Sequence, residues 1–240
     1  MNEWPLQPAK HQGRYDDLIY CPLDLPLPPT VDVPQFLQWM VSVQDPQMMA
    51  TKISYEQAQK RPYPWLSRLL KDPTQLKEAF PELYDYLLLY PFDDLTSLMF
   101  LAQEGHQDVF THCDPDGLHG MRLYLTVKNC EGLHFFKARQ PFDHFSTYSR
   151  NEAGETVSAD WGKYFKTDEP TYAHLPAPTR SFVLNSARAA HAVDRNTCAL
   201  GERICVLVFG TANVQRRDAL IERSLKRYGE NAIWYDKALS

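Results

Sequence analysis

The stretch Met121-Arg122-Leu123-Tyr124-Leu125-Thr126-Val127 decides the fold class of the second half of this chain. Within it, Arg122, Tyr124 and Thr126 alternate with aliphatic residues, and a period of two places polar and apolar side chains on opposite faces of a β-strand. One face of this strand is therefore expected to lie on a core. In a small barrel, the polar face would point into a site.

Further strands are expected on both sides of this stretch. The segments that predict them are bounded by turn residues and rich in β-branched and aromatic residues. They cover residues 109–112, 133–136, 181–184 and 203–209. Residues 140–180 interrupt the series with a polar, aromatic segment, which we interpret as an insertion, and residues 214–228 predict a charged, amphipathic C-terminal helix.

The first half of the chain has a different pattern. Residues 1–35 are rich in proline, which predicts an extended arm, with a short edge strand at 18–20. The following residues show apolar positions at helical spacing, interrupted by proline. The helices expected there cover residues 33–41, 55–58, 65–70, 76–80, 83–89 and 94–101.

Helices followed by strands indicate an α+β protein. We expect the β part to be a double-stranded β-helix, that is, a jelly-roll or cupin-like barrel, covered by an N-terminal helical layer. Residues 1–104 would form the arm and the helical layer. Residues 105–240 would form the barrel with its insertion and C-terminal helix, and the two parts would make one structural unit.

The composition excludes several classes of function. The chain has 240 residues, 44% of them apolar, and a net charge of −5, so it has no basic field for nucleic acid. No apolar stretch is long enough to span a bilayer, and the N-terminus lacks the pattern of a signal peptide. Five cysteines without paired spacing indicate a reducing compartment. We therefore expect a cytoplasmic protein with no membrane partner.

The residues His112-Cys113-Asp114 form a candidate metal-binding motif. Residues i and i+2 of a strand share a face, so His112 and Asp114 can converge on one metal ion, and the turn residues that follow place them at a strand end. A His-x-Asp pattern also occurs by chance at protein surfaces. His106-Gln107-Asp108 has the same pattern, but it follows Glu104-Gly105 rather than an apolar run.

His191 and Arg203 complete the candidate site from the last third of the chain. Two histidines and one carboxylate can occupy one face of an octahedral metal and leave the other face open, as in non-haem Fe(II) oxygenases. Arg203 begins the next strand, where its planar guanidinium could pair with a carboxylate of 2-oxoglutarate. By itself, Arg203 also fits a surface charge paired with Glu202 or Asp194.

Four segments of the chain resemble the aspartyl/asparaginyl β-hydroxylase family of Fe(II)/2-oxoglutarate-dependent oxygenases, which includes free-proline hydroxylases. The segments are 110–114, 121–125, 184–193 and 202–204. The N-terminal helical half and the insertion at 140–180 depart from the family pattern.

The resemblance implies roles for individual residues. His112, Asp114 and His191 would be the iron ligands, and Arg203 would bind the distal carboxylate of 2-oxoglutarate. Arg122 matches a family arginine that also contacts 2-oxoglutarate. Tyr124 stands where some members carry a histidine, so we include it among the residues expected to bind the co-substrate.

Other histidines could serve the same site. His119 and His134 are alternative ligands, and each also fits a structural histidine. His144 and His174 lie in the insertion, where they would touch substrate if this segment were a lid, or be exposed loop residues.

Three more residues lie close to the candidate ligands in sequence. Asn185 and Ser186 could orient His191 through hydrogen bonds, and they fit a turn equally well. Cys113, between two candidate ligands, is expected to be a buried thiol on the opposite strand face.

The function expected from these residues is that of a 2-oxoglutarate-dependent dioxygenase with Fe(II) and O₂. It would hydroxylate an unactivated C–H bond of an amino acid, a peptide or a related small molecule. The alternative is a non-catalytic cupin-like barrel or degenerate oxygenase that acts as an interaction protein. A metal-dependent isomerase or hydrolase on the same barrel is a weaker option.

Overall fold

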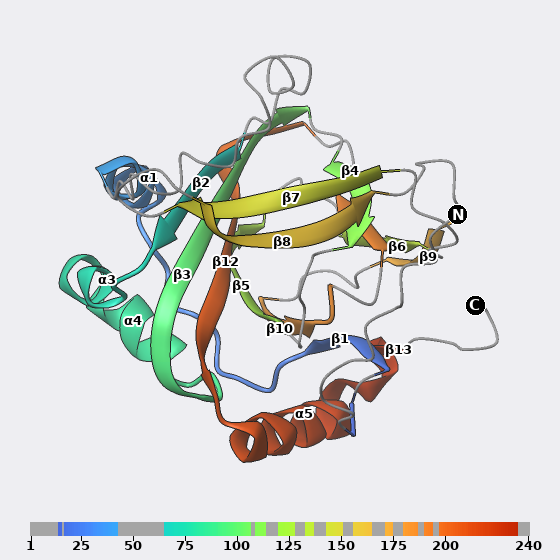
Figure 1. Cartoon of the computed structure of the whole chain (residues 1–240). Coiled ribbons are helices and arrows are strands. Elements are labelled where there is room, and N and C mark those ends of the chain that lie inside the picture. The colour runs from blue at the N-terminus through green and yellow to red at the C-terminus, as the bar shows by residue number, and fades with distance from the viewer. Residues whose placement is uncertain are drawn as a thin grey trace.

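Two antiparallel sheets dominate the computed structural model (Figure 1). It describes residues 14–15, 17–42, 65–106, 109–113, 120–127, 133–136, 143–150, 156–164, 171–174, 180–186, 190–193 and 197–234. The larger sheet has seven strands, in the order β13 (Ile233–Trp234), β1 (Leu18–Pro22), β10 (Ser181–Leu184), β5 (Gly120–Val127), β12 (Thr197–Ala212), β3 (Phe92–His106), β2 (Trp65–Leu70). The smaller sheet has six strands, in the order β7 (Asp143–Arg150), β8 (Thr156–Tyr164), β4 (Val109–Cys113), β11 (Ala190–Val193), β6 (Leu133–Phe136), β9 (Thr171–His174).

The strands of the two sheets pair in a nested way. The outgoing strands β3, β4, β5 and β6 alternate between the two sheets, beginning in the large one. The returning strands β9, β10, β11 and β12 alternate in the reverse order and end in the large sheet. Each outgoing strand pairs antiparallel with one returning strand, β3 with β12, β4 with β11, β5 with β10 and β6 with β9. Among the described residues no strand pairing joins the two sheets, so the large sheet is open rather than closed on itself.

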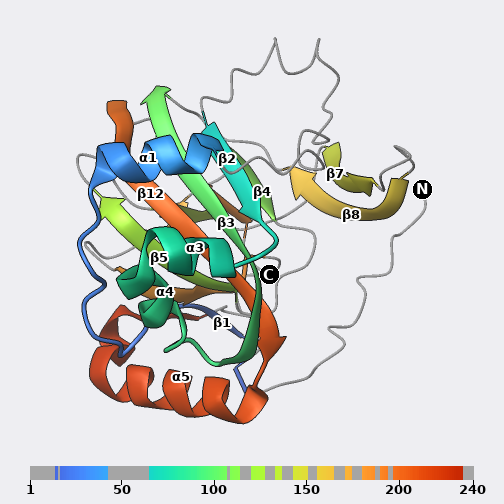
Figure 2. The same cartoon turned by 90° about the vertical axis from the view of Figure 1, so that its left-hand side faces the viewer.

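Helices cover one face of the seven-stranded sheet (Figure 2). They are α1 (Val33–Ser42), α3 (Thr74–Ala79), α4 (Pro81–Leu87) and α5 (Val214–Tyr228), and the 3₁₀ turn η2 (Gly229–Asn231) follows α5. Helix α4 starts with Pro81, whose missing N–H costs nothing at a first helical position. Helix α5 starts at the cap Asn213, whose side chain accepts a hydrogen bond from the amide of Arg216 at 2.9 Å.

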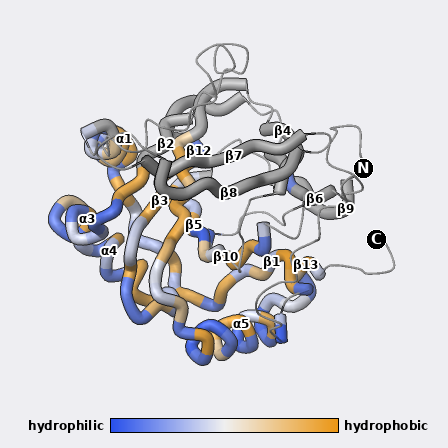
Figure 3. Tube along the Cα trace, in the orientation of Figure 1, coloured by the Kyte–Doolittle hydropathy of each residue, from blue (hydrophilic) through white to orange (hydrophobic). Residues whose placement is uncertain are grey.

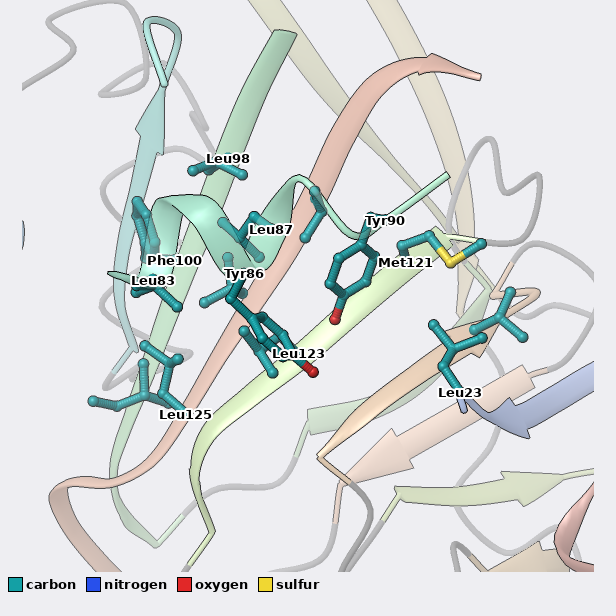
Figure 4. Close-up of a cluster of buried hydrophobic side chains, with 14 of the residues drawn as sticks. Leu23, Leu83, Tyr86, Leu87, Tyr90, Leu98, Phe100, Met121, Leu123 and Leu125 are labelled. Carbon is teal, nitrogen blue, oxygen red and sulfur yellow. The ribbon is translucent and has the colours of Figure 1, made fainter. Parts of the chain in front are cut away.

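The main core lies between these helices and the sheet (Figure 4). Phe36 of α1 is fully buried and packs edge-on against Phe80 and Phe100, with ring centroids 5.2 and 5.5 Å apart. From α4, Leu83 and Leu87 reach the same layer. The apolar strands of the large sheet, which Figure 3 shows in orange, give these side chains a continuous surface to pack on.

The N-terminal arm is tied to helix α5 by Asp24. Its carboxylate accepts hydrogen bonds from Arg223 at 3.0 Å and Arg227 at 2.5 Å, and its amide donates to Ser224 Oγ at 2.9 Å. The bond and charge of Arg227, with those of Arg223, lower the pKa of this carboxyl group. The segment that follows β1 is thereby attached to helix α5, while β1 itself pairs with β10.

Most of the expected elements are confirmed. The strands expected at 109–112, 121–127, 133–136, 181–184 and 203–209 are present, as are the helices expected at 33–41, 76–80, 83–89 and 214–228. The strand expected at 18–20 is present as β1, but it is not an edge strand, because β13 pairs with it on the outer side. The helix expected at 55–58 lies outside the described residues. The insertion 140–180 contains β7, β8 and β9.

Two expected helices are wrong. Residues 65–70 form strand β2, and residues 94–101 lie within strand β3. In β3, Leu98 and Phe100 are fully buried on the helix side, while Met99 between them is half-buried on the other side. A strand with apolar residues on both faces loses the simple alternation of polarity, so its sequence can match helical spacing.

These corrections change the picture of the N-terminal half. The large sheet contains β1, β2 and β3 beside β5, β10 and β12, so residues before and after position 104 share one sheet. The fold is a mixed α+β arrangement of a seven-stranded antiparallel sheet with a few helices on one face and a second sheet.

Candidate functional site

A polar group lies on the face of the large sheet that is turned away from the helices. In strand β5, Leu123 and Leu125 belong to the core beneath the helices, and in β12 Ile204 and Val206 do the same. The residues that alternate with them therefore occupy the opposite face. These residues are Arg122, Tyr124, Arg203 and Cys205. Figure 1 shows strands β4, β6 and β9 of the smaller sheet on this side.

Arg203 and Tyr124 form the centre of this polar group. Both are 5% exposed, and the guanidinium Nη2 donates to the Tyr124 hydroxyl at 2.7 Å. The guanidinium carbon also lies 5.2 Å from the centroid of the tyrosine ring, in cation–π range. Burial raises the pKa of Tyr124, although the charge of Arg203 opposes the shift. The phenol therefore stays neutral and offers its oxygen to the buried cation.

Arg122 and Cys205 extend the polar group along both strands. Cys205 pairs directly with Tyr124 across the sheet, and Arg122 lies two residues before Tyr124 on the same face. Burial raises the pKa of the Cys205 thiol, while the charges of Arg122 and Arg203 and a hydrogen bond from Arg122 oppose the shift. Two guanidinium groups thus act on one buried thiol.

Phe182 gives the polar group an apolar wall. Its ring lies 5.1 Å from that of Tyr124 and 5.5 Å from that of Tyr20, and both partners are buried. Phe182 is also directly opposite Arg122 in register, so its side chain shares the face of the polar group. In such surroundings an ionic hydrogen bond is stronger than it would be in water.

The second part of the candidate site lies in the smaller sheet. His191 of β11 is 4% exposed, and its Cα is directly opposite that of His112 in β4. Directly opposed residues of an antiparallel pair share a face of the sheet. The backbone therefore brings together two residues that are far apart in sequence, as the candidate metal site requires. Asp114 lies outside the described residues.

The remaining predicted residues occupy various positions. Asn185 and Ser186 are buried immediately after β10. His134 in β6 is opposite both Ala192 and His174, so it is one position away from His191 in register. His144 lies in β7, Cys113 ends β4, His106 ends β3, and His119 is outside the described residues. Among the residues with predicted roles, the structure describes the side-chain surroundings of Arg122, Tyr124, Arg203, His191, Asn185 and Ser186.

Sequence reasoning missed two residues of this region. Cys205 is two positions after Arg203 on the same strand, and this spacing alone could have placed it on the polar face. Arg180 could not have been found in this way. It precedes β10, and its guanidinium donates to the backbone carbonyl oxygens of Leu125 at 2.7 Å and Tyr124 at 3.4 Å.

The described residues contain neither a metal-binding cluster nor a membrane-spanning helix. Within the described residues there is no group of three or more His, Cys, Asp or Glu that could hold a metal ion. No helix in the described part of the chain is long and apolar enough to cross a membrane. The chain matches no protein-family model and no curated protein.

Proposed function

We propose that this protein is an Fe(II)- and 2-oxoglutarate-dependent dioxygenase that hydroxylates an amino acid, a peptide or a related small molecule. The observation that carries the proposal is the register of His112 opposite His191 in the smaller sheet. Strands of this sheet lie on the side of the large sheet that carries the buried pair Arg203 and Tyr124. Metal ligands and a carboxylate-binding residue would then belong to one site.

The arginine end of the site fits a dicarboxylate. A guanidinium presents its N–H donors in a planar fork that matches the two oxygens of a carboxylate. Arg203 is buried and bonds to Tyr124, whose ring packs on Phe182, so an anion bound there would be shielded from water. The hydroxyl of Tyr124 would donate a hydrogen bond to the same carboxylate, because its raised pKa keeps the hydroxyl protonated. Arg122, on the same face, would add a second positive charge.

The histidine end of the site fits a divalent transition metal. His112 and His191 would hold the ion with Asp114, and two imidazoles with one carboxylate are the donor set of non-haem iron oxygenases. Bound iron would couple the decarboxylation of 2-oxoglutarate by O₂, which yields succinate and CO₂, to the transfer of the second oxygen atom into a C–H bond. The protein would orient the substrates and exclude water.

The strand pairing supports the same proposal. In a jelly roll or double-stranded β-helix, an outgoing set of strands pairs with a returning set, and residues distant in sequence meet between two sheets. The nested pairing of β3 to β6 with β9 to β12 supports such an arrangement, while the large sheet itself is open among the described residues. Strands β7 and β8 of the insertion pair antiparallel, and this pair of strands would help to determine the substrate.

The test is anaerobic titration of the purified protein with Fe(II) and 2-oxoglutarate. We expect a visible metal-to-ligand charge-transfer band that disappears in Asp114→Ala. In Arg203→Met the band should require a higher concentration of 2-oxoglutarate. The control is Arg216→Met, because Arg216 lies at the far end of the large sheet and bonds to the backbone carbonyls of Phe92 and Tyr90.

The outcomes separate the proposal from its alternatives. Absence of the band in the wild-type protein would refute the oxygenase. If the protein binds 2-oxoglutarate without any metal, the function is that of a binding barrel. With a confirmed band, succinate formation in the presence of single amino acids and short peptides would identify the substrate class.

A further inference from the structure

Strand β5 contains a β-bulge beside the polar group. Ile204 of β12 pairs with Thr126, but the next residue, Cys205, pairs with Tyr124. One step on β12 therefore corresponds to two steps on β5, and Leu125 is the extra residue. A bulge bends its strand, increases the local twist and redirects the neighbouring side chains. This bulge lies between the pairing positions of Arg203 and Tyr124, whose side chains must meet.

Arg180 holds this bulge from the other side of β5. Its Nη1 donates to the Leu125 carbonyl oxygen at 2.7 Å and to the Tyr124 carbonyl oxygen at 3.4 Å. Its own carbonyl oxygen accepts from the Tyr124 amide at 2.7 Å. An extra residue disturbs the regular ladder, so carbonyl groups at a bulge need other donors. A cationic donor makes the stronger kind of hydrogen bond.

The backbone next to Arg180 is itself fixed. Ser181 is buried, its hydroxyl lies 2.6 Å from the Tyr86 hydroxyl of α4, and its carbonyl accepts from the Leu23 amide at 2.8 Å. Figure 4 shows Tyr86 and Tyr90 reaching from the helix layer toward the sheet. Tyr90 donates to the carbonyl oxygen of Arg122 at 3.1 Å. Arg180 therefore acts on β5 from a rigid base.

We infer that Arg180 is a positioning residue for the co-substrate site. By holding the Leu125 bulge, it fixes the direction of Tyr124 and hence the hydrogen bond between Tyr124 and Arg203. It touches neither the co-substrate nor the metal. The inference rests on the proposed function for its effect on 2-oxoglutarate, but its effect on Tyr124 follows from the strand geometry alone.

The experiment compares Arg180→Met with Arg216→Met. The two arginines make a useful comparison, because each donates to two backbone carbonyl groups and only Arg180 does so beside Tyr124. We expect Arg180→Met to weaken 2-oxoglutarate binding about tenfold, because a displaced Tyr124 would no longer donate its hydrogen bond to the carboxylate. Arg216→Met should leave the affinity unchanged. In Arg180→Lys, a single ammonium donor should restore part of the affinity.

A second measurement does not depend on 2-oxoglutarate. With ring-labelled tyrosine, the NMR signal of Tyr124, assigned through Tyr124→Phe, should shift in Arg180→Met and stay in place in Arg216→Met. Equal 2-oxoglutarate affinities in the two arginine variants, or an unmoved Tyr124 signal, would overturn the inference. If the wild-type protein binds no 2-oxoglutarate, the proposed function fails, and the Tyr124 signal alone decides whether Arg180 positions this residue.

Discussion

The hydrogen bond between Arg203 and Tyr124 makes a quantitative prediction for Tyr124→Phe. The substitution keeps the ring, its contact with Phe182 and its cation–π contact, and removes only the hydroxyl that accepts from Arg203 at 2.7 Å. A hydrogen bond to a charged group contributes about 1.5–3 kcal/mol, and here the guanidinium left behind is only 5% exposed. We therefore expect the free energy of unfolding to fall by about 2 kcal/mol.

Urea unfolding followed by tryptophan fluorescence measures this loss, since the chain contains five tryptophans. For a chain of this size, 2 kcal/mol corresponds to a fall of about 4–8 °C in melting temperature. Tyr90→Phe is the matched control. It removes a buried tyrosine hydroxyl that donates to the neutral carbonyl of Arg122 at 3.1 Å, so it should cost only about 1 kcal/mol.

A double-mutant cycle with Arg203→Met isolates the bond. In the background of Arg203→Met, the loss of the Tyr124 hydroxyl should cost much less, which leaves a coupling energy of about 2 kcal/mol. The reasoning is refuted if Tyr124→Phe costs no more than Tyr90→Phe, or if its cost is the same with and without the guanidinium.

Four further predictions concern the rest of the fold. Burial raises the pKa of Cys21 to about 12, so iodoacetamide should not modify this thiol in the folded protein at pH 9 but should modify it in urea. The unfolded thiol ionises at lower pH than the buried one. The stabilisation that comes from burying the neutral Cys21 thiol is therefore complete below pH 9 and is lost toward pH 12, by about 1.4 kcal/mol per pH unit. Phe100→Ala should cost about 3–5 kcal/mol in urea unfolding, since the ring is fully buried, and a cost below about 1 kcal/mol would contradict its place in the core. Gly210→Ala should cost about 1–3 kcal/mol in thermal unfolding, because a Cβ there would lie 2.7 Å from Phe92 Cγ and against the Asp94 carbonyl oxygen. Asn213→Ala should reduce stability by about 1 kcal/mol through loss of the cap of α5, whereas Asn213→Ser should retain most of it, as circular dichroism melts would show.

The sequence predicted strands best where one face of the strand is polar. Strand β5 has such an alternation, and its two faces were assigned correctly for Arg122, Leu123 and Tyr124. For β2 and β3 the sequence predicts helices, and this prediction is wrong. In β3, apolar residues on both faces match helical spacing. Which of these residues are buried depends on what packs on each face of the sheet, and this is a tertiary feature that the local sequence does not contain.

The candidate site was predictable in part for a similar reason. Strand periodicity predicts that His112 and Asp114 share a face and that Tyr124 lies on the polar face of its strand. The roles of His191, Arg203 and Tyr124 come from chain order and from the family resemblance. The direct register of His112 with His191 depends on which strands pair, and no local pattern encodes it. Arg180 was missed because its role comes from a bulge in a neighbouring strand, one residue out of step with β12.

The nested pairing of the strands also sets an order of assembly. Strands β6 and β9 are the closest in sequence among the nested pairs, so their pairing closes the shortest loop. Strand β3 can pair with β12 only after nearly the whole chain has been synthesised. On the ribosome, β3 therefore emerges long before its partner, with Leu98 and Phe100 exposed and one edge open to other chains. Strand β1 waits even longer for β13. A chain truncated before residue 197 would still contain the candidate ligand His112, but its seven-stranded sheet would lack β12. Such a chain should aggregate, and this aggregation should be detectable before any loss of activity is.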